Sequence, residues 1–142
     1  MKKEKSMKVV IDANIIFSAL LSINSQYRDL LFNEAYKFYS PNYVFLEIFK
    51  HKEKILQCSK ESEEEVYGFI GKILKKIHFV NEDLISEGNY LCAYSLCKEI
   101  DENDTPFVAL SLEIDGCLFT GDEKLKKALK NKGFDKFLLI KT

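Results

Sequence analysis

Carboxylates stand at positions in this sequence where they could share one chemical task. Asp12 and Asp122 each follow a short apolar run that is typical of a buried strand. Asp104 begins the most apolar segment of the chain, and Glu47 lies inside another apolar run. Clustered oxygen ligands without histidine or cysteine suit a hard cation, Mg²⁺ or Mn²⁺. Such an ion can activate water and stabilise a leaving oxygen, so the pattern indicates metal-assisted hydrolysis of a phosphodiester.

Each of these acids also has an ordinary structural role to play. Asp12, Asp104 and Asp122 are all well placed to cap the first turn of a helix. Glu47 could pair with Lys50 or His51, three and four residues further along a helix. Taken together, the acids indicate a metal site more strongly than any one of them does. Carboxylates within about 4–6 Å of one another cannot all stay ionised unless a cation compensates their charge.

The elements that would position these acids alternate between short apolar strands and longer helices. Strands are expected at 8–11, 37–39, 78–80, 117–119 and 137–140, and helices at 14–21, 26–35, 40–56, 61–76, 84–98, 104–114 and 123–131. The helix at 40–56 is expected to start with Ser40 as N-cap and Pro41 as its first residue. This alternation predicts an α/β fold, a three-layer α/β/α sandwich with a central parallel sheet.

In such a sheet, ligands bind in the crevice beyond the carboxyl ends of the strands. Asp12 and Asp122 fall at two such ends, and Asp104 falls at the head of the buried helix between them in the sequence. The predicted fold therefore brings at least these three acids toward one crevice.

Length and composition place the chain among ordinary globular proteins. It has 142 residues, 46% hydrophobic and 30% charged, which suits one domain, expected at 7–142 after a flexible tail at 1–6. The longest uncharged run, 13–27, is shorter than the ~20 apolar residues that a membrane span needs, and no secretory signal pattern is present. We therefore expect a cytoplasmic protein without a membrane partner.

The cysteines give no sign of a metal or redox site. None of the four lies in a Cys-x-x-Cys pair, and the chain has only two histidines, so a structural zinc site is not indicated. Cys92, Cys97 and Cys117 lie among apolar residues and are expected to be buried free thiols.

Nucleic-acid binding would have to come from local charge. The 21 basic residues nearly balance the 22 acidic ones, and the pI is about 6.2. Residues 123–142 nevertheless hold seven lysines against two acids. Lys124 and Lys127, together with Lys50 after Glu47, could border a groove for a phosphate backbone, although a lysine run is more often a solvated helix face.

Four segments, 9–14, 45–48, 101–110 and 120–122, together resemble the PIN-domain family of metal-dependent ribonucleases. The resemblance extends from residue 7 to residue 140 and is closest to compact prokaryotic single-domain members, which include VapC-type toxins of toxin–antitoxin pairs. It implies that one or two Mg²⁺ or Mn²⁺ ions are held, directly or through water, by Asp12, Glu47, Asp104 and Asp122. The implied activity is endonucleolytic cleavage of RNA that leaves 5′-phosphate and 3′-hydroxyl ends.

The same resemblance suggests supporting residues and partners. Asn14 would orient Asp12 or a water molecule, and Thr120 would bond the scissile phosphate or a metal-bound water. Asp101 is an added carboxylate three residues before Asp104, expected beside the site or at the surface rather than on the metal. An RNA substrate, an antitoxin protein and a second copy of the chain are the partners that the family suggests.

Two other functions stay open from the sequence. One is a metal- or RNA-binding PIN-like module with little or no nuclease activity. The other is a phosphatase with Asp12 as nucleophile, which would favour a second aspartate two residues later, where this chain has Asn14.

Overall fold

The computed structural model describes residues 6–21 and 25–139. Its centre is a parallel sheet of β1 (Met7–Ile11), β2 (Tyr36–Pro41), β3 (Ile77–Val80) and β4 (Cys117–Phe119), in the order β3-β2-β1-β4. β1 is an inner strand, and Val9, Val10 and Ile11 on it are fully buried. A strand covered on both faces needs such a continuous apolar run, as the sequence predicted.

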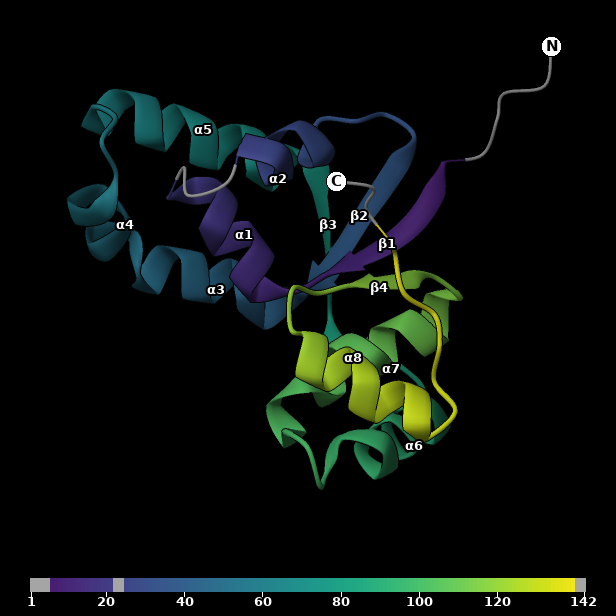
Figure 1. The fold of residues 1–142 in the computed structure, drawn as a ribbon. Coiled ribbons are helices and arrows are strands. Elements are labelled where there is room, and N and C mark those ends of the chain that lie inside the picture. Colours follow the sequence, from purple (N-terminus) through teal and green to yellow (C-terminus); the bar gives the residue numbers. More distant parts are fainter. Residues whose placement is uncertain (1–5, 22–24, 140–142) are drawn as a thin grey trace, which may run out of the picture.

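Helices cover both faces of this sheet, which confirms the three-layer architecture (Figure 1). One group gathers on one side and the other on the opposite side. The first group is α1 (Ala13–Leu20), α2 (Ser25–Leu31), α3 (Asn42–Lys50), α4 (Lys52–Cys58) and α5 (Glu63–Lys76). The second is α6 (Glu87–Cys97), α7 (Thr105–Ile114) and α8 (Glu123–Asn131), with the 3₁₀ turns η1 (Glu82–Leu84) and η2 (Glu102–Asp104) before α6 and α7.

The order of strands creates one topological switch point. The chain passes outward from β1 to β2 and β3, and then returns through α6 and α7 to place β4 on the other side of β1. α7 is buried along most of its length and leads back to the beginning of β4. Its first turn, next to Asp104, therefore lies at the edge where the strands end, and the crevice there opens between β1 and β4.

The turn between α7 and β4 is held tightly. Gly116 is buried, and a Cβ added to it would lie 3.0 Å from the carbonyl oxygen of Lys8, so a side chain would push against the β1 backbone. Ser111 donates a hydrogen bond to the Gly116 carbonyl, and Asp115 ends α7 in the left-handed conformation. This turn fixes how far α7 reaches and hence where its first turn sits.

The expected helix over 40–56 was wrong at both its start and its middle. Ser40 and Pro41 belong to β2, because the Ser40 hydroxyl is fully buried and donates to the carbonyl of Ile11 at 3.3 Å. The first turn of α3 is instead capped from outside, by a hydrogen bond from the Tyr43 N–H to the Glu82 carboxylate at 2.8 Å. His51 then ends α3 and precedes α4, so two helices replace one.

Other boundaries also differ from the predicted ones. α2 ends at Leu31 because the Asn33 side chain accepts from the Ala35 N–H and forms a turn instead. α6 begins after Ser86, whose hydroxyl accepts from Asn89. The strand expected at 137–140 is reduced to one bridge, between Leu118 and Phe137, and residue 140 lies outside the described residues, as do residues 1–5 of the expected tail.

Two further sequence expectations can be compared with the described residues. Cys97 is buried as expected, Cys117 is partly buried, and Cys92 was predicted wrongly because it is exposed on the outer side of α6. Among the residues described, no helix has the length and apolar character needed to cross a membrane.

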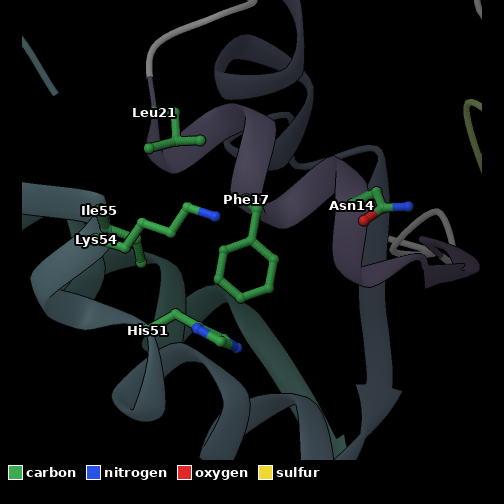
Figure 2. A pocket seen from close by; sticks show the side chains of 6 residues that line it. All are labelled: Asn14, Phe17, Leu21, His51, Lys54 and Ile55. Atoms are coloured by element: carbon green, nitrogen blue, oxygen red, sulfur yellow. The ribbon is translucent and has the colours of Figure 1, made fainter. Parts of the chain in front are cut away.

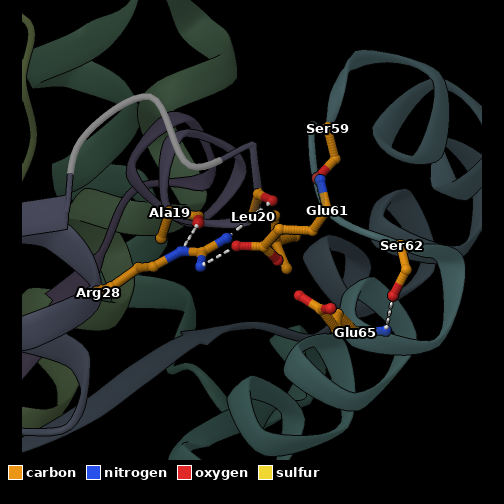
Figure 3. A network of polar contacts seen from close by, with 7 residues as sticks. All are labelled: Ala19, Leu20, Arg28, Ser59, Glu61, Ser62 and Glu65. Carbon is orange, nitrogen blue, oxygen red and sulfur yellow. Dashed lines mark hydrogen bonds and ion pairs between the residues drawn. The ribbon is translucent and has the colours of Figure 1, made fainter.

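Arg28 on α2 ties together the helices that hold α1 in place (Figure 3). Its Nε donates to the carbonyl of Ala19 at 2.6 Å, near the end of α1, and its Nη1 donates to Glu61 at 2.7 Å. The guanidinium also lies 4.0 Å from the centre of the Phe69 ring on α5. One planar group thus satisfies a helix-end carbonyl, a carboxylate and an aromatic face together.

Replacing Arg28 with lysine should therefore lower the free energy of unfolding by about 2 kcal/mol, because an ammonium group cannot reproduce the planar fork. Urea denaturation would measure the loss. Lys72 is exposed and lines the surface recess that Arg28, Glu61 and Phe69 also line. Lys72→Ala is therefore the matched control and should change stability by less than about 0.5 kcal/mol. An unchanged urea midpoint for Arg28→Lys would contradict the assigned role.

Candidate metal-binding site

Asp12 is fixed at the junction of β1 and β4 by three hydrogen bonds. Its N–H donates to the carbonyl of Phe119 at 3.0 Å, which continues the pairing of the two strands past the end of β1. The whole residue is only 9% exposed. One oxygen accepts from the Asn14 N–H and the other from the Thr120 hydroxyl, both at 2.9 Å. Asp12 therefore caps α1, as one interpretation of the sequence held, and also faces β4.

Thr120 links two of the predicted acids. Its hydroxyl is almost fully buried; it donates to Asp12 and accepts from the N–H of Asp122 at 3.1 Å. Asp122 in turn accepts from the N–H of Leu125 at 3.0 Å and caps α8. A single hydroxyl thus sets the distance between the ends of β1 and β4 and orients the Asp12 carboxylate.

Asp104 completes the group from the opposite layer. It precedes α7 but makes no side-chain capping bond, so its carboxylate is not used to cap the helix. Burial, followed by the negative charges of Asp12, Asp101 and Asp122, raises the pKa of Asp104 to about 7. The charges of Asp12, Asp101 and Asp122 thus act on Asp104 across the switch point. We call Asp12, Asp104 and Asp122 the acidic triad.

The acidic triad has the chemistry of a hard-metal site. Its donors are all carboxylate oxygens, and among the described residues no lysine, arginine or histidine forms an ion pair with any of the three. A divalent cation would supply the missing positive charge. The described side chains do not form a ready-made metal-binding cluster of three or more His, Cys, Asp or Glu residues. The side chains would therefore have to close around an ion.

Glu47, the fourth predicted acid, is not brought into this group. Its carboxylate is half exposed on α3 and pairs with the His51 Nε2 at 3.2 Å. It is also absent from the charges that act on Asp104. The i,i+4 pairing with His51, which the sequence had offered as an alternative, is the contact that forms.

Asp101 lies near the triad without joining it. It is exposed and accepts from the N–H of Asn103 at 3.0 Å, which caps the 3₁₀ turn before Asp104. Its charge still contributes to the raised pKa of Asp104. This placement agrees with the expectation of an acid beside the site.

Asp12 and Asp122, but not Asp104, line a cavity of about 380 Å³ that is flanked by two others. Its lining comprises Asp12, Asn14, Ile15, Ser18, Tyr27, Thr120, Gly121 and Asp122. A recess of about 340 Å³ shares Tyr27, Thr120 and Gly121 with it and is bordered by Lys126 and Lys130 of α8. A third cavity, of about 280 Å³, shares Asn14.

The lysines proposed from the sequence lie outside these cavities. Lys50, Lys124 and Lys127 are exposed, and none of them is among the lining residues of the three cavities. α8 instead directs Lys126 and Lys130 toward the recess beside Thr120. Helical spacing could have indicated this, since Lys126 and Lys130 lie four residues apart and each directly follows a leucine that faces the core, Leu125 or Leu129.

Tyr43 is a residue near the site that the sequence analysis did not single out. Burial, followed by the charges of Asp12, Asp104 and Glu82, raises the pKa of its hydroxyl. Its ring packs edge-on against Phe107 of α7 at 5.9 Å. Its position just after the end of β2, at the carboxyl edge of a parallel strand, was the available signal.

The comparisons with known proteins agree with this arrangement. A family model described as PIN domain matches residues 10–137. A chain in the crystal structure of VapBC2 from Rickettsia felis bound to a DNA fragment from their promoter matches with a TM-score of 0.60 and 18% identity. That match covers 86% of this chain and 93% of that chain, and identity at this level shows a shared fold alone. No curated protein matches.

Removing the charge of Asp104 should stabilise the metal-free protein. At pH 8 the carboxyl is ionised in both folded and unfolded chains, because its folded-state pKa is about 7 and its ordinary value is 3.8. Since the pKa is raised on folding, ionisation disfavours the folded state. Asp104→Asn should raise Tm by about 3 °C, equivalent to about 1 kcal/mol for this half-exposed group.

Thermal unfolding in EDTA would measure this change. Glu102→Gln is the matched control, because it removes one exposed carboxylate from the same turn. A Tm of Asp104→Asn at or below that of the wild type would contradict the repulsion inferred for the acidic triad.

Replacing Thr120 with valine should weaken metal binding without removing a carboxylate. Valine keeps the volume and loses the hydroxyl that orients Asp12, and loss of such a supporting partner costs about 10–100-fold in metal affinity. Isothermal titration with Mn²⁺ would measure it. Thr120→Ser keeps the hydroxyl and should restore most of the affinity. Equal Mn²⁺ affinity of the valine and serine variants would show that the hydroxyl does not position the site.

Proposed function

Because this chain belongs to the PIN-domain family, we propose that it is a metal-dependent endoribonuclease whose acidic triad holds Mg²⁺ or Mn²⁺. The observation that carries the proposal is that Thr120 joins Asp12 and Asp122 at two neighbouring strand ends of the topological switch point, with no cation partner for Asp12, Asp104 or Asp122 among the described residues. Burial, followed by the charges of Asp12, Asp101 and Asp122, raises the pKa of Asp104 and supports the same proposal. One or two ions bound there would activate a water molecule and stabilise the leaving oxygen of a phosphodiester.

The protein's own residues have separate tasks in this proposal. Asp12 and Asp122 would provide carboxylate oxygens for the ion from two neighbouring strand ends, and Thr120 keeps them in register. Asp104 would bind from the α7 side, where burial makes its charge costly until a cation is present. Asn14, exposed at the start of α1, is placed to contact the substrate or a water molecule beside Asp12.

Glu47 would take part through a change of partner. Its side chain is half exposed and held by one pair with His51, a contact of a kind that contributes little to stability at a surface. Rotation of Glu47 away from His51 would let it join the ion through water. The proposal therefore keeps Glu47 among the catalytic acids, although without an ion it pairs with His51 rather than lying with the other acids.

The substrate's phosphates would be held beside the acids. Lys126 and Lys130 border the recess that shares Thr120 and Gly121 with the acidic cavity. Together with Lys50, Lys124 and Lys127, these lysines would contact the phosphate backbone of the RNA. Each lysine that binds a phosphate releases counterions from the RNA. RNA is the proposed nucleic acid because of the family resemblance in the sequence.

The partners of this nuclease are also part of the proposal. The matched VapBC2 structure holds a complex bound to promoter DNA. By analogy we propose that this chain is the toxin of a toxin–antitoxin pair, inhibited by an antitoxin protein, and that it forms a homodimer. Copurification from cells that coexpress a neighbouring small gene would test the first partner.

The central prediction is metal-dependent RNA cleavage that requires both Asp12, at the end of β1, and Asp104, at the start of α7. Purified protein should cut end-labelled single-stranded RNA in Mn²⁺ or Mg²⁺ and lose the activity in EDTA. Asp12→Asn and Asp104→Asn should each lower the rate by about 100-fold or more, because each removes a ligand rather than a supporting partner. Gel electrophoresis of the products measures the rates and the cut positions.

Glu102→Gln, in the same turn as Asp104 but outside the acidic triad, should cut RNA at the wild-type rate. Cleavage that survives in both aspartate variants would exclude the acidic triad as the catalytic site. A folded protein that binds Mn²⁺ and RNA but cuts no RNA would instead favour the PIN-like binding module.

A further inference from the structure

A third cavity, shown in Figure 2, shares Asn14 with the cavity lined by Asp12 and Asp122. We call it the Phe17 cavity. It has a volume of about 280 Å³ and lies between α1 and the α3–α4 break, lined by Asn14, Phe17, Leu21, His51, Lys54 and Ile55. Nothing in the proposed catalysis uses Phe17, Leu21 or Lys54.

The chemistry of this cavity is that of a site for a flat, polar ring. Phe17 and His51 present two rings, with centroids 6.0 Å apart and planes at 77°, so one ring stands against the edge of the other. Leu21 and Ile55 supply an apolar wall, while Lys54 reaches across the opening from α4 (Figure 2). Apolar walls with a few polar groups are the usual make-up of small-molecule sites.

The size of the cavity limits what it can hold. Ligand sites for drug-sized molecules measure about 300–1,000 Å³, so about 280 Å³ suits a single ring system rather than a peptide helix or a duplex. A nucleobase fits this description, since every base has a π-face for stacking and ring or carbonyl acceptors for an ammonium donor.

The position of the cavity ties it to the acids. Asn14 lines both the Phe17 cavity and the acidic cavity, and its N–H is the donor that holds Asp12. A nucleotide whose phosphate lies against the acidic triad would therefore have its base directed along α1 toward Phe17. His51 lines the Phe17 cavity and pairs with Glu47 in this structure, so the cavity also borders an acid that the proposed function uses.

We propose that the Phe17 cavity binds one nucleobase next to the scissile phosphate. The inference rests on the proposed nuclease function, because the phosphate at the acids is what brings a base to this cavity. Phe17 stacks on the base, and Lys54 bonds its acceptors.

The first test uses nucleosides, which carry neither a phosphate nor a scissile bond. Uridine, cytidine, guanosine and adenosine are titrated into metal-free protein while the aromatic NMR signals of Phe17 and His51 are followed. At least one nucleoside should shift both rings in a saturable manner. Lys54→Ala should weaken the response about fivefold or more. Lys52→Ala, at an exposed position on α4 outside the lining, is the matched control and should leave the response unchanged.

The second test places the base within RNA. A six-nucleotide RNA is bound in EDTA, with one base at a time removed to leave an abasic sugar. Loss of a stacked base should weaken binding by the wild type about 5- to 100-fold at one position. Phe17→Leu keeps an apolar side chain at this partly buried position but has no ring, so the same abasic change should cost it less than about twofold.

The outcomes separate this inference from the proposed function. Absence of nucleoside shifts at Phe17 and His51, or equal binding of all six abasic RNAs, would overturn the base site even if RNA is cut normally. Shifts caused by p-cresol but by no nucleoside would also overturn it and assign the cavity to a protein side chain. Nucleoside shifts in a protein that cuts no RNA would uphold the base site and refute the nuclease.

Discussion

The hydrogen bond between Thr120 and Asp12 is the contact on which the site depends most. It joins residues 108 positions apart in the sequence and connects the ends of β1 and β4 at the topological switch point of the sheet. The same hydroxyl accepts from the backbone of Asp122, so a displacement of β4 would move two acids at once. Because both partners are buried, water cannot replace the bond without leaving a polar group unsatisfied.

The apolar layers around this contact make the charge cluster possible and also costly. β1 is buried on both faces, and α7 is buried along most of its length, so the acids sit on a rigid frame that cannot relax away from them. Asp12 and Asp122 reduce the cost by accepting backbone N–H bonds at helix starts. Asp104 makes no capping bond with its side chain, and burial, followed by the charges of Asp12, Asp101 and Asp122, raises its pKa. Stability lost at a site in this way is expected where binding of a cation restores it.

The sequence was most informative where short-range patterns decide the structure. Short apolar runs predicted the strands at 8–11, 78–80 and 117–119, because such runs are typical of strands buried on both faces of a parallel sheet. The acids that follow the first and the last of these strands could therefore also be placed at strand ends. The failures were tertiary. Ser40 and Pro41 carry a helix-start signal, but the bond from Ser40 to Ile11 draws them into β2. Glu47 differs from the other acids through its i,i+4 pair with His51, which the sequence had offered as an alternative, whereas the break between α3 and α4 was not predicted. The bond from Ser40 to Ile11 could not be predicted without knowing which strands become neighbours.

The distribution of charge, rather than the net charge of −1, bears on the proposed nuclease function. A phosphate backbone is repelled by the acidic triad, so it can approach only with a cation bound there. The lysines nearest the acids do not neutralise them; Lys126 pairs with Glu123, and Lys130 lies near Asp135 and the Phe137 ring. If a lysine had paired directly with Asp12 or Asp104, it would have stabilised the empty site and competed with the ion. The lysines lie at the border of the site, and the carboxylates at its centre accept hydrogen bonds mainly from backbone N–H groups. This arrangement leaves the carboxylates free to bind a cation.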